Sequence, residues 1–297
     1  MLEFYLIIHF LFTVMQFLIG VLANGIIVVV NGTELIKQRK MIPLALLLCC
    51  LAISRICLQL IIFFMNLGTL FLIEVPLLAD NFVIFVFVNE LGLWFATWLG
   101  VYYCAKIAPI THSFFFWLKI RISKWMPWLI LGSMMYASVP SVFCSKQIWV
   151  YSQNVLSSLF SPNATQIKET SALQIAFLIR LLLPLLIFLG STLLLIFSLG
   201  RHTWQMRNTA TGPRDPSTGV HVSTILSVLS FLVLCLSHYM AAALLSFQIF
   251  QLRSLVFLIC LWVFGSYPSG HSMILILGNP KLKQNAKKLL LHGKCCQ

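Results

Sequence analysis

Acidic residues are scarce in this chain of 297 residues, which contains 20 Lys and Arg but only seven Asp and Glu. Charged residues of both signs make up 9% of the sequence, whereas 60% is hydrophobic and the mean hydropathy is +0.96. A soluble domain of this length needs a charged surface that so few ionisable side chains cannot supply. The composition therefore excludes an ordinary soluble protein and predicts one whose solvent is the lipid bilayer.

Motifs for catalysis and for metal binding are also absent from the sequence. There is no H-E-x-x-H, no G-x-S-x-G and no Walker phosphate loop, and no two histidines stand at a metal-binding spacing from each other. Nothing in the sequence therefore supports an enzyme, a cofactor or a metal site. A small transporter stays as an alternative, but the chain shows no inverted repeat and no matched pair of broken spans.

Long apolar runs occur seven times, and each is long enough to cross a hydrocarbon core, which takes about 20 helical residues. The first run lacks a preceding cation and a small-residue cleavage site, so it reads as a retained span rather than a signal peptide. The expected fold is an all-α bundle of seven transmembrane helices over 1–277, followed by a tail at 278–297. The spans are expected near 4–30, 41–66, 81–105, 125–144, 175–199, 222–245 and 255–277.

Basic residues concentrate on one membrane face when the connecting segments are assigned to the two sides in turn. That face holds three in 31–43, four in 105–126, three in 201–221 and five in the tail, against Lys146, Lys168 and Arg253 opposite. The bias predicts a cytoplasmic tail and an extracellular N-terminus, and it assigns the net positive charge to the bilayer surface rather than to nucleic acid.

Two segments carry candidate modification sites. The sequon at Asn163 falls in the predicted outer loop 145–174, whereas the one at Asn31 falls on the predicted cytoplasmic side, so Asn163 is the expected glycosylation site. The tail has the spacing of a basic amphipathic helix on the inner membrane surface. Its Cys295 and Cys296 are candidates for palmitoylation or remain free thiols.

Polar side chains inside the second span share one face. Arg55, Gln59 and Asn66 are four and seven residues apart, which keeps them within about 40° on a helix. Because polar groups in spans face the bundle interior, this stripe predicts an inward seam, with Asn24 of the first span as a hydrogen-bond acceptor for Arg55. We interpret Asn24, Arg55 and Gln59 as an interior network that holds helices together.

The third span places Asn89, Ala96 and Gly100 along one line, a small-residue stripe that permits close helix packing. Glu90 lies on its flank, about 14 Å into the span. An unpaired carboxylate at that depth is strongly disfavoured, so Glu90 needs water, a proton or a partner. Either a ligand pocket open to the exterior or an ion pair with a neighbouring span meets that need.

Motifs along the whole chain resemble the type 2, or bitter, taste receptors. They are LAISR at 51–55, WFATWLGVYYCAKIA at 94–108, SLGRHTWQM at 198–206, RDPSTGVHV at 214–222, SFL at 230–232 and HSMILILGNPKLKQ at 271–284. The resemblance implies a G-protein-coupled receptor of the plasma membrane that binds bitter small molecules and activates a gustducin-type G protein. A pheromone-type chemosensory receptor is the alternative with the same architecture.

The sites expected on this basis lie at the two ends of the bundle. An agonist pocket is expected in the outer half between the second, third and seventh spans, with Asn66, Asn89 and Glu90 as polar anchors and Phe85 in its wall. Phe85 stands where many members of the family have Trp, so the resemblance does not indicate which ligand this chain binds. The expected G-protein face carries Lys106, Lys119, Arg121 and Arg201.

Overall fold

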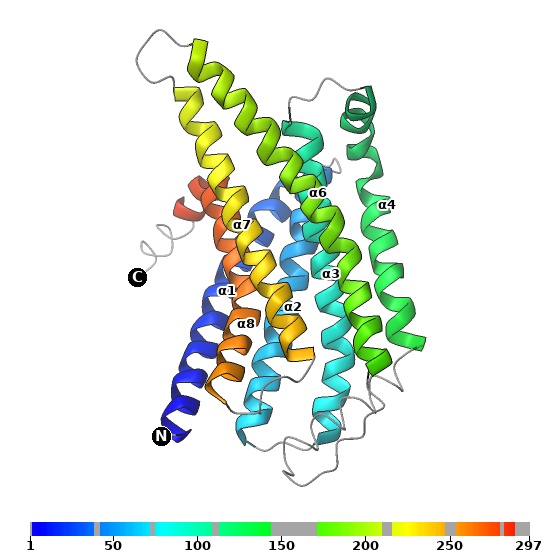
Figure 1. Ribbon diagram of the computed structural model, residues 1–297, viewed down its shortest axis with the longest axis vertical. Coiled ribbons are helices and arrows are strands. Elements are labelled where there is room, and N and C mark those ends of the chain that lie inside the picture. The colour runs from blue at the N-terminus through cyan, green and yellow to red at the C-terminus, as the bar shows by residue number, and fades with distance from the viewer. Residues whose placement is uncertain are drawn as a thin grey trace.

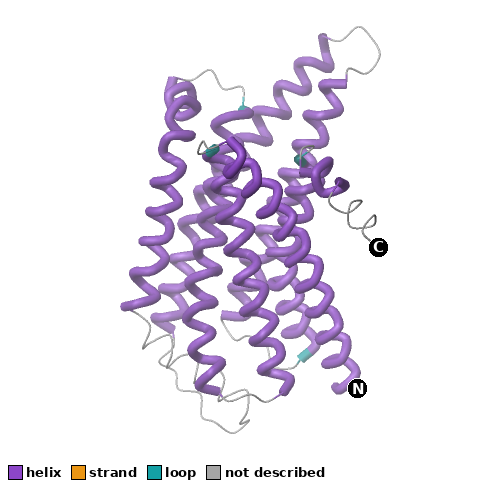
Figure 2. The backbone as a smooth tube through the Cα atoms, turned by 180° about the vertical axis from the view of Figure 1, so that it is seen from behind, coloured by secondary structure: helices purple, strands orange, loops and turns teal. Residues whose placement is uncertain are grey.

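The computed structural model describes residues 2–38, 42–71, 75–108, 113–143, 171–209, 216–246, 254–279 and 282–288. Within these ranges the chain forms seven long helices and no strand (Figures 1 and 2). The fold class expected from the sequence, an all-α membrane bundle, is confirmed. The helices are α1 (Leu2–Gln38), α2 (Pro43–Phe71), α3 (Val75–Ile107), α4 (Ser113–Phe143), α6 (Ser171–Thr209), α7 (Pro216–Ser246) and α8 (Leu255–Gly278).

Six of these helices are long and apolar enough to cross a bilayer, namely α1, α2, α3, α6, α7 and α8. Large apolar side chains on their outer faces stay exposed, as Leu22 and Phe197 do at 68% and 72%, which suits contact with lipid. The remaining long helix, α4, is less apolar because Trp, Ser, Pro and Tyr interrupt its hydrophobic residues. Pro184 and Pro268 lie inside α6 and α8, where neighbouring helices can satisfy the carbonyl groups that each proline frees.

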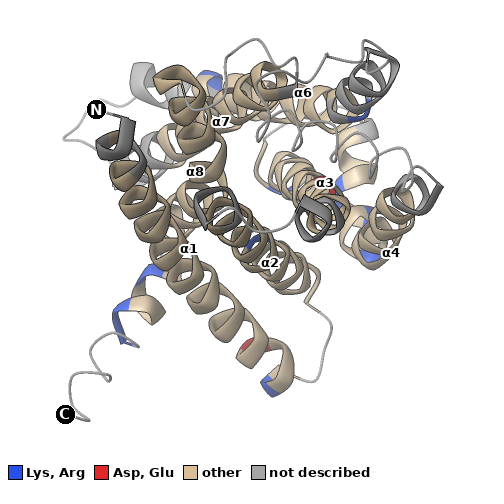
Figure 3. Ribbon diagram, turned by 90° about the horizontal axis from the view of Figure 1, so that it is seen from below, with Lys and Arg blue, Asp and Glu red and all other residues tan. Residues whose placement is uncertain are grey.

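Six helices form a ring in the order α1, α2, α3, α6, α7 and α8, and α4 packs on the outside of α3, as an end view shows (Figure 3). Each helix of the ring contacts the next, α8 closes the ring against α1, and α4 contacts α3 and α2. Small residues permit the closest approaches. A Cβ atom added at Gly100 of α3 would lie 3.3 Å from the Phe188 ring of α6. The backbone of α3 at Gly100 therefore packs directly against that ring.

The bundle has two distinct ends. We call the end with Leu2 the N-terminal end, and the end where α8 stops the tail end. At the tail end α6 and α7 extend together beyond the other helices (Figure 1). Asn279 ends α8 there, and its side-chain Oδ1 accepts a hydrogen bond from the Leu282 amide at 3.3 Å, which caps a short helix at 282–288. Leu282 and Ala286 are buried against the bundle, whereas Lys283, Lys287 and Lys288 are exposed.

Candidate functional site

A buried ion pair joins α3 to α6 in the N-terminal half of the bundle. Glu90 Oε2 accepts a hydrogen bond from the Arg180 guanidinium, and the two side chains are 6% and 21% exposed. Two turns further along, the Thr97 hydroxyl donates to the Pro184 carbonyl at 3.1 Å, so the same faces of the two helices meet twice. Of the two readings that the sequence left open for Glu90, the structure contains the ion pair with a neighbouring helix.

Hydrogen-bonding capacity is left over around this ion pair. Glu90 Oε1 and Arg180 Nε are buried without a hydrogen-bond partner, and so are Asn89 Oδ1 and Trp94 Nε1 on the same stretch of α3. Buried polar atoms are nearly always paired in folded proteins, because an unpaired one costs about 1 to 3 kcal/mol. Glu90 Oε1 and Asn89 Oδ1 are thus acceptors, and Arg180 Nε and Trp94 Nε1 donors, that no other group of the protein uses. We call Asn89, Glu90, Trp94 and Arg180 the α3–α6 polar cluster.

Phe85 lies one helical turn from Asn89 and forms an aromatic wall. Its ring centroid is 5.7 Å from that of Phe82 on α3 and 5.7 Å from that of Phe264 on α8. Phe85 is 9% exposed and belongs to the apolar core of the N-terminal half. Apolar walls beside a few polar groups are the usual make-up of small-molecule sites.

Arg55 is the centre of a second network, which joins α2 to α8 and α1. Its guanidinium donates to His271 Nδ1 and, at 3.3 Å, to Ser272 Oγ. The Ser272 hydroxyl in turn donates to Asn24 Oδ1 at 2.6 Å. Asn24 is thus connected to Arg55 through Ser272 rather than by the direct hydrogen bond expected from the sequence. All four side chains are buried.

The other two residues of the α2 stripe face α1. Gln59 Nε2 donates to the Gln16 carbonyl at 3.4 Å, and Asn66 Oδ1 lies 3.0 Å from His9 Nε2. Asn66 therefore belongs to the α1 side of the bundle, whereas Glu90 faces α6. Figure 3 shows these two helices well apart. The structure brings Glu90 together with Arg180 and leaves the neighbouring Asn89 Oδ1 without a partner, but it does not bring Asn66 to this ion pair.

Sequence reasoning missed Arg180 as the partner of Glu90 and His271 as the partner of Arg55. A signal for the first pair was present, since a span with one carboxylate and a span with one cation both need compensation. The histidine gave no such signal, because neither its spacing nor its neighbours set it apart.

The four cations that the sequence predicts for a G-protein face lie at the tail end, on α3, α4 and α6. Lys106 Nζ donates to the Lys119 carbonyl at 2.8 Å, which links the end of α3 to α4. The guanidinium carbon of Arg121 lies 5.7 Å from the centroid of the Trp117 ring, and Arg201 is exposed on α6. Lys106 thus contributes to the contact between α3 and α4, whereas Arg201 contributes a charge to the protein surface.

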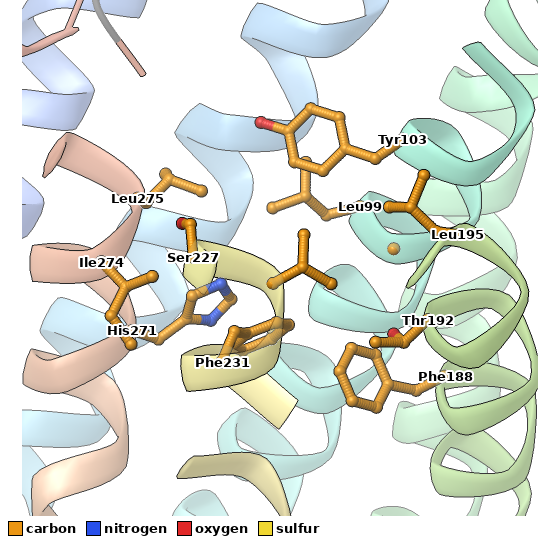
Figure 4. A pocket seen from close by; sticks show the side chains of 12 residues that line it. Leu99, Tyr103, Phe188, Thr192, Leu195, Ser227, Phe231, His271, Ile274 and Leu275 are labelled. Carbon is orange, nitrogen blue, oxygen red and sulfur yellow. The ribbon is translucent and has the colours of Figure 1, made fainter. Parts of the chain in front are cut away.

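A cavity of about 60 Å³ lies between α3, α6, α7 and α8 in the tail half (Figure 4). Apolar side chains such as Leu99 and Phe231 form most of its wall, and the His271 imidazole stands beside the Phe231 ring. Its polar side chains are Tyr103, Thr192, Ser227 and His271.

Several predicted sites lie outside the described residues, namely Asn163, Cys295 and Cys296. The described cysteines are free thiols, and most are buried or half-buried. Over the described ranges, no group of His, Cys, Asp and Glu has the arrangement of a metal site.

Seven long helices over the described residues, six of them apolar and long enough to cross a bilayer, define a multi-pass membrane protein. The sequence profile of the family described as taste receptor protein (TAS2R) matches residues 1–294. The chain is 58% identical over 299 residues to taste receptor type 2 member 1 of Chlorocebus aethiops, with both chains fully covered. It is 51% identical to member 119 of Rattus norvegicus, covering 88% of that protein, and 35% identical to member 2 of Homo sapiens over 99% of each chain. The chain belongs to this taste receptor family.

Proposed function

We propose that this protein is a bitter-taste receptor that binds bitter small molecules in the N-terminal half of the bundle and activates a gustducin-type G protein at the tail end. Family membership supports the receptor class and speaks against the pheromone-type alternative. The basic residues at the tail end support an orientation with that end in the cytoplasm and the N-terminus outside, in the plasma membrane.

The observation that carries the proposed pocket is the α3–α6 polar cluster. Four buried polar atoms there have no partner, and the Arg180 side chain keeps 21% of its surface exposed, so the ion pair can be reached. A ligand that bonds Glu90 Oε1 or Asn89 Oδ1 uses capacity that the protein leaves unused. Phe85 and its aromatic neighbours supply apolar surface for a ligand body.

Agonists of varied structure fit such a site, because few of its contacts are directional and much of its surface is apolar. The polar anchors are Asn89 and Glu90, with Arg180 as the third. Asn66 acts through the packing of α1 against α2, since its side chain bonds His9.

The test is calcium release in cells that express the receptor with a taste G protein, measured against a panel of bitter compounds. Signalling without net uptake of the compounds is expected, whereas uptake without signalling would support the transporter alternative.

Glu90→Gln and Asn89→Ala, compared at equal surface expression, should raise the half-maximal agonist concentration about tenfold or more, the effect of losing a charge-assisted hydrogen bond. The matched control is Ser138→Ala on α4, whose hydroxyl bonds the Met135 carbonyl. Unchanged responses of both variants to several unrelated agonists would place the pocket elsewhere.

A further inference from the structure

Pro268 interrupts the backbone hydrogen bonds of α8. Proline has no N–H, so the Phe264 carbonyl, one turn earlier, lacks its usual donor. His238 of α7 supplies a replacement, because its Nδ1 lies 3.3 Å from that oxygen. A carbonyl oxygen only accepts, so Nδ1 carries the proton and Nε2 of the neutral imidazole is an acceptor. The contact is longer than the usual range of about 2.7 to 3.2 Å, so it ties α7 to α8 weakly.

The His238 ring lies between two aromatic rings of α8. Its centroid is 4.4 Å from that of Phe264 and 4.4 Å from that of Tyr267, with interplanar angles of 27° and 29°. His238 and Tyr267 are buried. Phe264 also packs on Phe85, the aromatic wall on α3. A displacement of Phe85 therefore reaches His238 through a single intervening ring.

Three buried polar atoms around this stack have no hydrogen-bond partner within the described part of the chain: Arg55 Nε, the Tyr267 hydroxyl and His238 Nε2. Their side chains, from α2, α8 and α7, are consecutive neighbours. The guanidinium carbon of Arg55 lies 5.6 Å from the centroid of the Tyr267 ring, and that ring stacks on His238. Unpaired polar atoms are rare in protein interiors, so three on adjacent side chains call for an explanation.

The hydrogen-bonding capacities of these three atoms complement one another. Arg55 Nε–H only donates, the Tyr267 hydroxyl accepts and donates, and His238 Nε2 accepts. A chain from Arg55 Nε–H to the Tyr267 oxygen, and from Tyr267 O–H to His238 Nε2, would satisfy all three atoms. The chain is compatible with the existing hydrogen bonds, because Arg55 uses its other two nitrogens for its partners on α8 and His238 uses Nδ1.

From this arrangement we propose that α7 has a second packing against α8 and α2, in which this chain is closed, and that this packing is the one that activates the G protein. Tyr267 is then a positioning residue, because its hydroxyl bonds in the signalling packing and not in the one described. A helix bundle with two packings of similar free energy is an element on which a ligand acts as a switch. α7 suits this role, since it runs from the His238 stack to the tail end, where it extends beyond the bundle with α6 (Figure 1). This role of Tyr267 rests on the proposed receptor function but not on the position of the agonist pocket.

Removing one hydroxyl tests the switch. Tyr267→Phe keeps the ring and its contacts, and the hydroxyl that it removes has no partner in the packing described. The unfolding temperature of the purified full-length receptor in detergent should therefore equal or exceed that of the parent. Nucleotide exchange on the G protein, driven by a saturating bitter compound that activates the parent, should fall about fivefold, because the signalling packing loses a hydrogen bond.

Three outcomes would overturn the switch. Full exchange in Tyr267→Phe at equal receptor concentration would show that the chain is not needed, and raised exchange without any compound would assign the chain to a silent packing. A lower unfolding temperature with a proportional loss of exchange would make the hydroxyl merely structural. The response of the parent tests the proposed receptor function, whereas the ratio of Tyr267→Phe to parent tests the switch.

A second variant identifies the acceptor. His238→Phe keeps a stacked ring but removes Nε2, and also the weak contact with the Phe264 carbonyl, so it should lower exchange at least as much. Tyr267→Phe added to it should cause little further loss, because the hydrogen bond is already missing. The matched control is Tyr136→Phe on α4, which is 38% exposed and lies outside the stack, and it should keep the exchange rate of the parent. Losses that simply add in the double variant would show that Tyr267 and His238 do not bond each other.

Discussion

The Trp262 indole of α8 donates a hydrogen bond to His9 Nδ1 of α1 at 2.6 Å, which fixes the tautomer of that histidine. With Nδ1 accepting, the proton lies on Nε2, and this nitrogen faces Asn66 Oδ1 of α2 at 3.0 Å. Three helices at the N-terminal end are thus joined through one imidazole. The Gln16 side chain adds a bond of 2.9 Å to the Trp262 carbonyl.

Replacing Trp262 should loosen this junction. Trp262→Phe keeps a ring but removes the donor, so the free energy of unfolding should fall by about 1 kcal/mol, the usual net value of one hydrogen bond. The measurement is thermal unfolding of the purified receptor in detergent. Trp128→Phe on α4 is the control, because Trp128 is 72% exposed and should be almost neutral.

The same junction predicts coupling between Trp262 and Asn66. Both act on the orientation of His9, so the double variant Trp262→Phe with Asn66→Ala should lose less stability than the sum of the single variants. Strict additivity in this double-mutant cycle would contradict a relay through His9.

A side chain at Gly20 should displace the buried Gln59 amide and break its bond to the Gln16 carbonyl, because a Cβ atom there would overlap that amide. Gly20→Ala should therefore lower the free energy of unfolding by about 1 to 3 kcal/mol, the usual cost of overpacking. Adding Gln59→Ala should recover part of that loss by removing the obstacle. The control is Gly25→Ala on the same helix, where a Cβ atom meets nothing within 4 Å and helix propensity favours Ala. Equal unfolding temperatures of the two alanine variants would contradict the close contact between α1 and α2.

The sequence predicts the membrane class and the helical fold because both follow from composition and from the length of apolar runs. It also predicts that Arg55 and Gln59 are buried, since their spacing puts them on one helix face. Which neighbour that face meets depends on how each helix is rotated in the bundle. Periodicity in one helix contains no such information, and for this reason Asn66 was expected beside Glu90 rather than beside His9.

The candidate sites were harder to predict than the fold for the same reason. Glu90 was expected to need a partner, but Arg180 lies 90 residues away, and only the packing of α3 against α6 brings the two together. The cavity in the tail half arises from side chains of four helices that leave a gap together. No single span contains a pattern for it.

Glycosylation tests the orientation of the bundle. Enzymatic deglycosylation should change the gel mobility of the parent protein but not that of Asn163→Gln, because Asn163 is expected on the outer side. Asn31 is a poor acceptor for a second reason. Its side chain is buried in α1 and donates to the Ile27 carbonyl at 2.8 Å. A mobility shift that persists in Asn163→Gln and disappears in Asn31→Gln would reverse the orientation.

Arg201 should contribute to G-protein activation more directly than Lys106 does. Lys106 is tied to the Lys119 carbonyl, so its loss also loosens α4, whereas the Arg201 side chain is exposed on α6. Arg201→Gln should lower the rate of G-protein activation about two- to fivefold, since one exposed charge contact is worth up to about 1 kcal/mol. Surface expression and the unfolding temperature should stay at parent values.

The measurement is nucleotide exchange on the G protein at a saturating agonist concentration, and the effect should shrink at high salt because exposed charges are screened. Lys37→Gln at the end of α1 is the matched control, an exposed cation at the same membrane face that should leave the rate unchanged. If Arg201→Gln and Lys37→Gln behave alike at low salt, the cations of α6 serve only to hold the helix at the membrane surface.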